Sequence, residues 1–179
     1  MEELFNVDIT TNKLVGFCDA AHANNLQNRQ STTAVVFTFM GGAIIYKLKT
    51  QSLTAGSLTE AEFIAAHSAG KVAWYLQFLL KDLSYEQSEP TPIYNNNQAC
   101  IHWSYNNTSK GLHYIQIKEN AVRENIQLNN ISITHIEGKI NVADIFTKEN
   151  KDYNHYIDMR NTLMHFTPMY SNPSHNNHL

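Results

Sequence analysis

The sequence lacks any run of apolar residues that approaches the roughly 18 residues of a membrane span. It has only two cysteines, Cys18 and Cys100, which lie far apart without a CxxC pair. This spacing argues against both a zinc site and a disulfide framework. The acidic start, Met-Glu-Glu-Leu-Phe, lacks the basic region of a signal peptide. We therefore expect an intracellular protein, cytoplasmic or nuclear, that is neither secreted nor bound to a membrane.

An excess of positive charge is also absent, because 13 lysines and arginines oppose 16 aspartates and glutamates, for a net charge of −3. A polyanion such as nucleic acid would therefore have to be held by local basic patches. There is no glycine-rich phosphate loop either, since Gly41-Gly42 is followed by neither the helix nor the lysine that such a loop requires. These absences argue against a nucleotide site of that kind and against nucleic-acid binding by overall charge.

What is present is the composition of one globular domain. A chain of 179 residues with 42% hydrophobic residues can bury a sizeable core. Pro168 and Pro173 end regular structure near the C-terminus. We predict a single domain over residues 1–166 and a disordered polar tail over 167–179. The tail contains His175 and His178, but a polar terminal run is more typical of solvated chain than of a metal site.

Apolar alternation and helical periodicity predict the elements of this domain. We expect strands over 13–20, 32–40, 43–49, 92–95 and 131–136, helices over 58–83 and 110–127, a short helix ending at Trp103, and a final helical region from 141 to 163. Gly41-Gly42 predicts a tight hairpin turn. The first three strands follow one another and should pair antiparallel, whereas each of the last two follows a helix and should pair in parallel. The fold class is therefore α/β, a five-stranded mixed sheet flanked by helices.

The long helix carries two glutamates with different expected orientations. Ser57 and Glu60 form a capping-box pattern, so we expect Glu60 to cap the helix and face solvent. Glu62 continues an apolar stripe that we expect to be buried: Ala65, Ala69, Val72, Leu76, Leu79 and Leu83. A carboxylate at the buried end of such a stripe is unfavourable unless a cation or hydrogen bonds hold it. Glu62 is therefore either a functional residue or a residue at the edge of the stripe.

Two further carboxylates lie at the ends of predicted elements. Asp19 ends the first strand, and Asp144 lies near the start of the last helical region. Taken alone, Asp19 could form a turn and Asp144 could cap a helix. If the fold gathers both with Glu62, their repulsion would require a divalent cation such as Mg²⁺ or Mn²⁺, which prefers oxygen ligands. The joint pattern predicts metal-assisted phosphoryl chemistry.

Six short motifs over residues 14–148 resemble the ribonuclease H domain of Ty1/copia-type retrotransposon polyproteins. They are Cys18-Asp19-Ala20, Arg29-Gln-Ser-Thr32, Gly41-Gly42, Leu58-Thr-Glu-Ala-Glu-Phe63, Tyr94-Asn-Asn-Asn-Gln98 and the highly specific Val142-Ala-Asp-Ile-Phe-Thr-Lys148. The resemblance implies a ribonuclease H-like fold in which four acidic positions bind two Mg²⁺ ions and the RNA strand of an RNA–DNA hybrid is hydrolysed. Asp19, Glu62 and Asp144 match three of these catalytic, metal-binding positions.

The fourth acidic position carries an amide in this chain. The family has an aspartate before Asn-Gln, where this sequence has Asn96. An amide offers an oxygen but no negative charge, so we expect both metal affinity and catalysis to be impaired. Ala21 and Gln116 stand where relatives often have aspartates, and His22 stands at an aromatic position. This chain therefore has fewer acidic residues at these positions than its relatives have.

Two further assignments rest on position alone. His135 precedes Asp144 by nine residues, roughly where cellular ribonucleases H place a histidine that helps to protonate the leaving group. A strand-end histidine with one hydrogen bond is the alternative. Four basic residues on one predicted helix could follow a phosphate backbone: Lys110, His113, Lys118 and Arg123. Their alternative is a solvated face of mixed charge, because Glu119 and Glu124 lie on the same helix.

Three functions therefore remain open. The chain is a nuclease that tolerates Asn96, a catalytically inactive module that binds nucleic acid or protein, or a non-functional remnant of a mobile element. Because the sequence begins close to its first predicted strand, we expect a domain detached from the reverse transcriptase that precedes it in the polyproteins of the family.

Overall fold

The computed structural model describes residues 12–106, 113–148 and 152–164. Within these ranges the strands are β1 (Val15–Ala21), β2 (Thr32–Phe39), β3 (Gly42–Thr50), β4 (Thr91–Asn95) and β5 (Ile131–His135). The α-helices are α2 (Leu58–Asp82), α3 (Gln98–Tyr105), α4 (His113–Gln127) and α5 (Tyr153–Met164). The 3-10 helices η1 (Gly138–Ile140) and η2 (Val142–Phe146) lie between β5 and α5.

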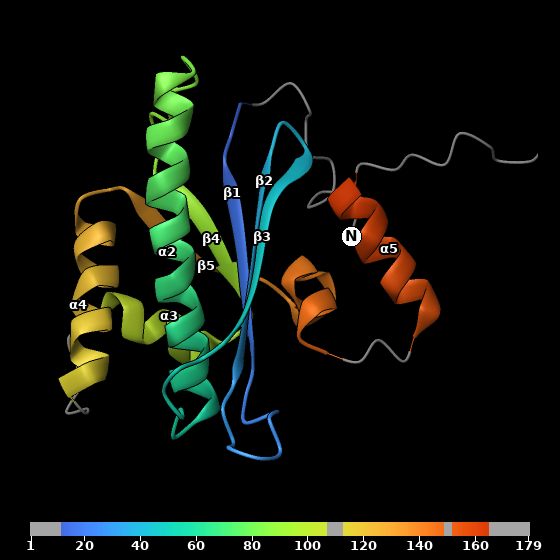
Figure 1. Cartoon of the computed structure of the whole chain (residues 1–179). Coiled ribbons are helices and arrows are strands. Elements are labelled where there is room, and N and C mark those ends of the chain that lie inside the picture. Colours follow the sequence, from blue (N-terminus) through green and yellow to red (C-terminus); the bar gives the residue numbers. More distant parts are fainter. Residues whose placement is uncertain (1–11, 107–112, 149–151, 165–179) are drawn as a thin grey trace, which may run out of the picture.

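The strands form one sheet in the order β3-β2-β1-β4-β5 (Figure 1). β1 pairs antiparallel with β2, and β2 pairs antiparallel with β3. β1 pairs in parallel with β4, and β4 in parallel with β5. The predicted five-stranded mixed sheet is confirmed, and β1, the strand that carries Asp19, is its central strand.

The turn between β2 and β3 differs from the prediction by one residue. Phe39 pairs with Gly42, so the turn residues are Met40 and Gly41 rather than Gly41-Gly42. Both have positive φ, at 49° and 77°, as a type I′ hairpin turn requires. Gly41 adopts this conformation without a steric penalty, whereas Gly42 begins β3 in the ladder.

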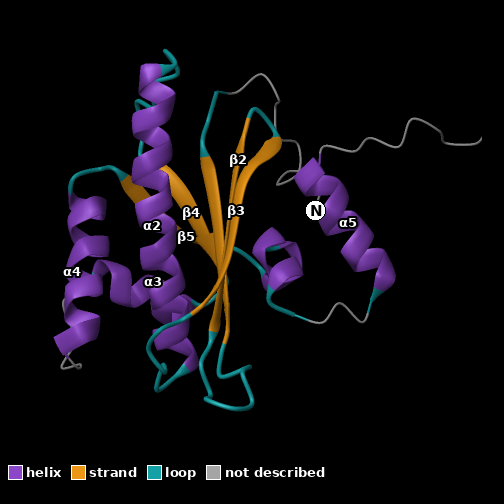
Figure 2. Ribbon diagram, in the orientation of Figure 1, coloured by secondary structure: helices purple, strands orange, loops and turns teal. Residues whose placement is uncertain are grey.

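Helices cover both faces of the sheet, as Figures 1 and 2 show. α2 packs against β1 and β2, and both α3 and α4 contact α2 on the same side. η2 packs against β1 and β2 from the other side, where α5 contacts η2 and β3. β1 therefore lies between α2 and η2, the elements that carry Glu62 and Asp144. None of the helices within the described ranges combines the length and the apolar character needed to cross a membrane.

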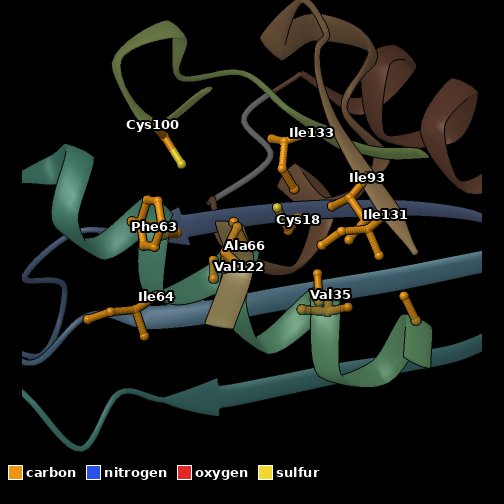
Figure 3. Packing of buried hydrophobic residues seen from close by; sticks show 14 of the residues in the cluster. Cys18, Val35, Phe63, Ile64, Ala66, Ile93, Cys100, Val122, Ile131 and Ile133 are labelled. Carbon is orange, nitrogen blue, oxygen red and sulfur yellow. The ribbon is translucent and has the colours of Figure 1, made fainter. Parts of the chain in front are cut away.

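The larger core lies between α2 and the sheet (Figure 3). Phe63 and Ala66 of α2 belong to the same buried cluster as Val35 of β2 and Ile93 of β4. Cys18 is buried in this cluster as a free thiol. A smaller cluster lies on the other face and contains Ala34, Val36, Val142, Ala143 and Leu163. Apolar packing on both faces therefore fixes β1 and its neighbours in place.

α2 buries a different stripe at its C-terminal end from the one predicted. Leu79 and Leu83 are 40% and 58% exposed, and Ala73 and Leu80 are buried instead. The predicted stripe alternates steps of three and four residues, which is a period of 3.5. A straight helix with 3.6 residues per turn drifts by about 20° per seven residues from that period. Near Glu62 the drift is small, so Ala65 and Ala69 are buried as predicted.

The predicted final helical region is divided in two, since η2 ends at Phe146 and α5 begins at Tyr153. Asn141 caps η2, because its side-chain oxygen accepts the N–H of Ala143 at 3.2 Å. The amide of the same Asn141 donates to the carbonyl of Cys18 at 3.0 Å. This bond attaches η2 to the central strand. Lys110 and the predicted tail over 167–179 lie outside the described residues.

Gly16 provides a test of the close packing on β1. A β-carbon at Gly16 would lie 2.6 Å from Cε1 of the buried Phe37, whereas one at Gly42 would meet nothing within 4 Å. We expect Gly16→Ala to lower the free energy of unfolding by about 1–3 kcal/mol, because an overpacked core forces side chains out of position. Urea unfolding of both variants measures the difference. An equal effect of Gly42→Ala would contradict this account of the packing.

Candidate functional site

The parallel pairing of β1 with β4 stops before the carboxyl ends of both strands. The pairs are Gly16 with Ile93 and Phe17 with Tyr94, and no later pair is formed between the described residues of these strands. Beyond this point the amide Nδ2 of Asn95 lies 3.5 Å from the carbonyl oxygen of Cys18. Ligand sites of open α/β sheets lie at such carboxyl ends, next to strands whose connections run in opposite directions.

Three buried carboxylates from three elements lie near one another beyond the last β1–β4 pair. Asp19 comes from β1, Glu62 from α2 and Asp144 from η2, and their exposed fractions are 1%, 3% and 7%. Asp19 and Asp144 are close enough to share a hydrogen bond, and the charge of Asp19 also acts on Glu62. The structure therefore brings together the three residues that the sequence scatters.

Asp19 does not form a turn and Asp144 does not cap a helix, although the sequence alone allowed both. Asp19 lies inside β1 and pairs with Ala34 rather than forming a turn. Asp144 lies within η2, whose capping residue is Asn141. Both carboxylates are therefore placed by regular structure and not by a local turn or a cap.

The two glutamates of α2 have the separate roles that the sequence predicts. The side chain of Ser57 accepts the N–H of Glu60 at 3.2 Å, which is the capping bond. The carboxylate of Glu60 accepts the N–H of Gly56 at 2.7 Å, one residue earlier than a capping box places it. Glu62 points the other way, into the core, where it accepts a hydrogen bond from the backbone N–H of Ala20.

Asn95 is a site residue that sequence reasoning missed. Its side chain is fully buried, and its Nδ2 donates to Oε2 of Glu62 at 2.9 Å. Its Oδ1 accepts the N–H of Asn97 at 2.8 Å, which fixes the orientation of the amide. Asn97 in turn caps α3 through the N–H of Cys100. The sequence signal that identifies Asn95 is the alternation of buried and partly buried positions along β4, which puts Asn95 on the same inward face as Ile93.

Asn96, the amide at the fourth acidic position, lies next to Asp144. A β-carbon at Gly138 would stand 3.3 Å from Nδ2 of Asn96 and 4.0 Å from Oδ2 of Asp144. Both groups therefore border the small space that the missing side chain of Gly138 leaves open. Asn96 is half-buried and directly follows β4.

Thr147 and Lys148 give the cluster two more hydrogen-bond donors, and sequence reasoning did not single them out. The hydroxyl of Thr147 donates to Oδ2 of Asp19. The ammonium of Lys148 donates to Oδ2 of Asp144, and its charge also interacts with Asp19 and Glu62. The signal for Lys148 was its spacing of four residues from Asp144, which puts an acid and a base within reach on one helical turn.

Burial changes the proton affinity of these groups. It raises the pKa of Glu62 to about 8 and that of Asp144 to about 7, and in both cases the charge of Asp19 adds to the rise. Burial lowers the pKa of Lys148, but the hydrogen bond from its ammonium to Asp144 and the charges of Asp19 and Asp144 outweigh that effect and raise it. The cluster favours bound protons or another positive charge.

The donors present suit a hard divalent cation. Oδ1 of Asp144 is buried and has no hydrogen-bond partner, and a carboxylate oxygen in that condition is stabilised by a cation. Among the described residues, however, no three His, Cys, Asp or Glu side chains are already arranged to hold a metal ion together. One oxygen of each carboxylate instead accepts an internal hydrogen bond: Asp19 from Thr147, Glu62 from Asn95 and Asp144 from Lys148.

The other predicted site residues lie apart from this cluster or outside the described part. His135 is exposed at the end of β5, opposite Asn95 in the strand register. Arg123 is largely buried, donates to the carbonyl of Trp103 at 3.0 Å and pairs with Glu119. Its guanidinium therefore stabilises the packing of α4 on α3. Lys118 is partly buried near Lys71 and Glu60.

Comparison with known sequences finds relatives among retrotransposon polyproteins. The chain is 35% identical over 136 residues to the retrovirus-related Pol polyprotein from transposon TNT 1-94 of Nicotiana tabacum, a match that covers 75% of this chain and 10% of the polyprotein. It is 28% identical over 138 residues to the transposon Ty1-JR1 Gag-Pol polyprotein of Saccharomyces cerevisiae, covering 76% of this chain and 8% of that one. The chain thus spans about a tenth of the length of these relatives. No family model matches the sequence.

Solved structures of ribonucleases H share the fold. RNase H1 from Halobacterium salinarum superposes with a TM-score of 0.56 at 17% identity, covering 82% of this chain and 98% of that one. LC11-RNase H1 in complex with RNA/DNA hybrid superposes with a TM-score of 0.53 at 13% identity, covering 72% of this chain and 88% of that one. The protein therefore has the ribonuclease H-like fold and is a relative of the Ty1 and TNT 1-94 retrotransposon polyproteins.

Proposed function

We propose that the domain is a metal-dependent endonuclease that hydrolyses the RNA strand of RNA–DNA hybrids, and that Asn96 weakens this activity. The observation that carries the proposal is that Asp19, Glu62 and Asp144, which are far apart in the sequence, are buried together beyond the last paired residues of β1 and β4. LC11-RNase H1, which has the same fold, has been solved with an RNA/DNA hybrid. This likeness supports a hybrid as the nucleic-acid partner.

Asp19, Glu62 and Asp144 would hold Mg²⁺ or Mn²⁺. When bound, the ions would activate a water molecule and stabilise the charge that develops on the phosphate. The residues around them orient the carboxylates: Asn95 and the N–H of Ala20 fix Glu62, and Thr147 fixes Asp19. His135, exposed at the end of β5 and opposite Asn95 in the strand register, is our candidate for returning a proton to the leaving oxygen.

Asn96 reduces the charge available to hold cations. Two dications opposite four carboxylates are balanced, whereas opposite three carboxylates they leave one positive charge uncompensated. The two ions of such sites lie about 3.5–4 Å apart and repel each other strongly. The amide of Asn96 borders the same space at Gly138 as Oδ2 of Asp144, but it brings no charge to offset that repulsion. We therefore place the defect at the second metal position.

A basic region on α2 and α4 is our candidate for contact with the phosphate backbone. Burial, with the nearby charges of Lys71, Lys118 and Lys47, lowers the pKa of His67 to about 4. Lys47 donates to the hydroxyl of Ser68 at 3.2 Å, so β3 contributes to the same region. Positive charge gathered locally can bind a polyanion although the whole chain carries −3. Lys118 belongs to this set, and the side chains of Lys110 and His113 are not described.

The alternative function is a catalytically inactive module that binds nucleic acid or protein. One observation favours it: internal donors already engage all three carboxylates, so the cluster is partly satisfied without a metal. Calorimetric titration with Mg²⁺ and Mn²⁺ distinguishes the two functions. Binding at the cluster supports the nuclease, and its absence supports the inactive module.

The two glutamates of α2 make a matched pair of variants. We expect Glu62→Gln to weaken Mn²⁺ binding by about tenfold or more, because it removes a charge from the buried cluster. Glu60→Gln should leave Mn²⁺ binding unchanged and lower the free energy of unfolding by at most about 1 kcal/mol, since it alters only the cap. Calorimetry and thermal unfolding measure both. Equal effects of the two variants on metal binding would show that Glu62 does not serve the site.

Asn96→Asp should increase hybrid cleavage by about tenfold or more, because it restores the missing charge at the metal site. A labelled RNA–DNA hybrid is cleaved in Mg²⁺ and in Mn²⁺ by wild type, by Asn96→Asp and by Asn96→Asp combined with Asp19→Asn. The double variant should be inactive. If the wild type cleaves as fast as Asn96→Asp, the amide is tolerated, and if none cleaves, the inactive module is the better description.

The raised pKa values predict how stability depends on pH when chelator is present. Glu62 has a pKa of about 8 in the folded protein against an ordinary 4.5, so the folded state holds more protons than the unfolded state between these values. The free energy of unfolding should therefore fall as the pH rises from 4.5 to about 8. Urea unfolding across this range measures the slope, and Glu62→Gln should flatten it. A wild-type stability that rises over the same range would contradict the assignment.

A further inference from the structure

We propose that the ammonium group of Lys148 is an internal counter-ion of the carboxylate cluster, and that a divalent cation has to displace it in order to bind. Lys148 would then set the metal affinity of the site. This inference rests on the proposed function, because it takes Asp19, Glu62 and Asp144 as the residues that would hold the metal.

The position of Lys148 supports this role. Its ammonium donates to Oδ2 of Asp144, while the other oxygen of that carboxylate, Oδ1, is buried without a hydrogen-bond partner. The charge of Lys148 also interacts with Asp19 and with Glu62. One positive group therefore interacts with all three carboxylates, as a bound cation would.

The side chain of Lys148 is free to move its ammonium out of the cluster. Its side chain is 51% exposed, whereas that of Asp144 is 9% exposed, so the lysine reaches into the cluster from solvent. Rotation about its own side-chain bonds returns the ammonium to water and leaves η2 in place. The backbone N–H of Lys148 donates to the carbonyl of Asp144 at 3.1 Å, a bond that does not involve the ammonium.

The charge count explains why lysine and metal compete. When fully ionised, the three carboxylates carry three negative charges, and the ammonium of Lys148 leaves only two of them uncompensated to attract a metal. A carboxylate oxygen that accepts the ammonium cannot also hold a metal at the same point, so Oδ2 of Asp144 has to exchange one cation for the other. Because Asn96 stands in place of a fourth carboxylate, the cluster has one negative charge fewer to share between the ammonium and a metal. Lysine and metal therefore compete more strongly here than they would in a site with four carboxylates.

Lys81 offers a matched control. It also pairs with a carboxylate, Glu86, at 2.6 Å, but both partners are more than half exposed and lie at the far end of α2. Replacing either lysine by glutamine removes one positive charge from an ion pair and keeps a side chain of similar length. The two variants therefore have the same change in net charge and differ in location.

Calorimetric titration of the full chain with Mn²⁺ compares wild type, Lys148→Gln and Lys81→Gln. We expect Lys148→Gln to bind Mn²⁺ about tenfold more tightly than wild type, because the competing charge is gone. Lys81→Gln should bind as wild type does. Unchanged or weaker binding by Lys148→Gln, with its circular dichroism intact, overturns the inference.

A second measurement uses the wild type and does not depend on how a variant folds. An amine-reactive reagent labels the lysines with and without Mn²⁺, and mass spectrometry follows each site. Labelling of Lys148 should rise several-fold with Mn²⁺ as its ammonium is released, while labelling of Lys81 stays constant. If Mn²⁺ binds and Lys148 labelling does not change, the inference fails and the proposed function stands. If neither wild type nor Lys148→Gln binds Mn²⁺, both fail together.

Discussion

Three like charges buried at the centre of one sheet constrain the whole site, because carboxylates removed from water repel one another and lose their solvation. The protein offsets this with hydrogen-bond donors that come from separate elements. Asn95 of β4 donates to Glu62, Thr147 donates to Asp19, and Lys148 donates to Asp144. The cluster is stable only because β4 and the end of η2 are held against β1 at the same point.

The packing of β1 makes this arrangement possible. The strand lies between α2 and η2, and its parallel ladder with β4 ends at Phe17, just before the acidic residue. Asn141 bonds η2 to the carbonyl of Cys18, the residue next to Asp19. Small and closely packed positions such as Gly16 let Phe37 fill the core against the same strand. The site therefore lies where the ladder stops.

The net charge of the carboxylate cluster distinguishes a nuclease from an inactive binding module. A nuclease needs enough negative charge to hold cations close together, whereas a binding module needs the cluster to be stable without them. Asn96 and Lys148 both move the site toward the second condition, since one omits a negative charge and the other adds a positive one. The basic region around His67, Lys71 and Lys118 is compatible with either function, because both can involve a polyanion.

The sequence by itself determined the strands and the long helix. It also determined that Glu62 points inward and that Glu60 belongs to the cap, since local periodicity and capping chemistry fix which face of a helix is buried. It also pointed to Asp19 and Asp144 by their motifs. Only the tertiary structure decided that the turn is Met40-Gly41, that Leu79 and Leu83 leave the core, and that Arg123 serves packing. Likewise, Asn95 and Lys148 lie within motifs of the sequence, but their roles depend on Glu62, Asp19 and other residues that are far away along the chain. Contacts between distant segments depend on how helices pack on a sheet, which no local pattern encodes.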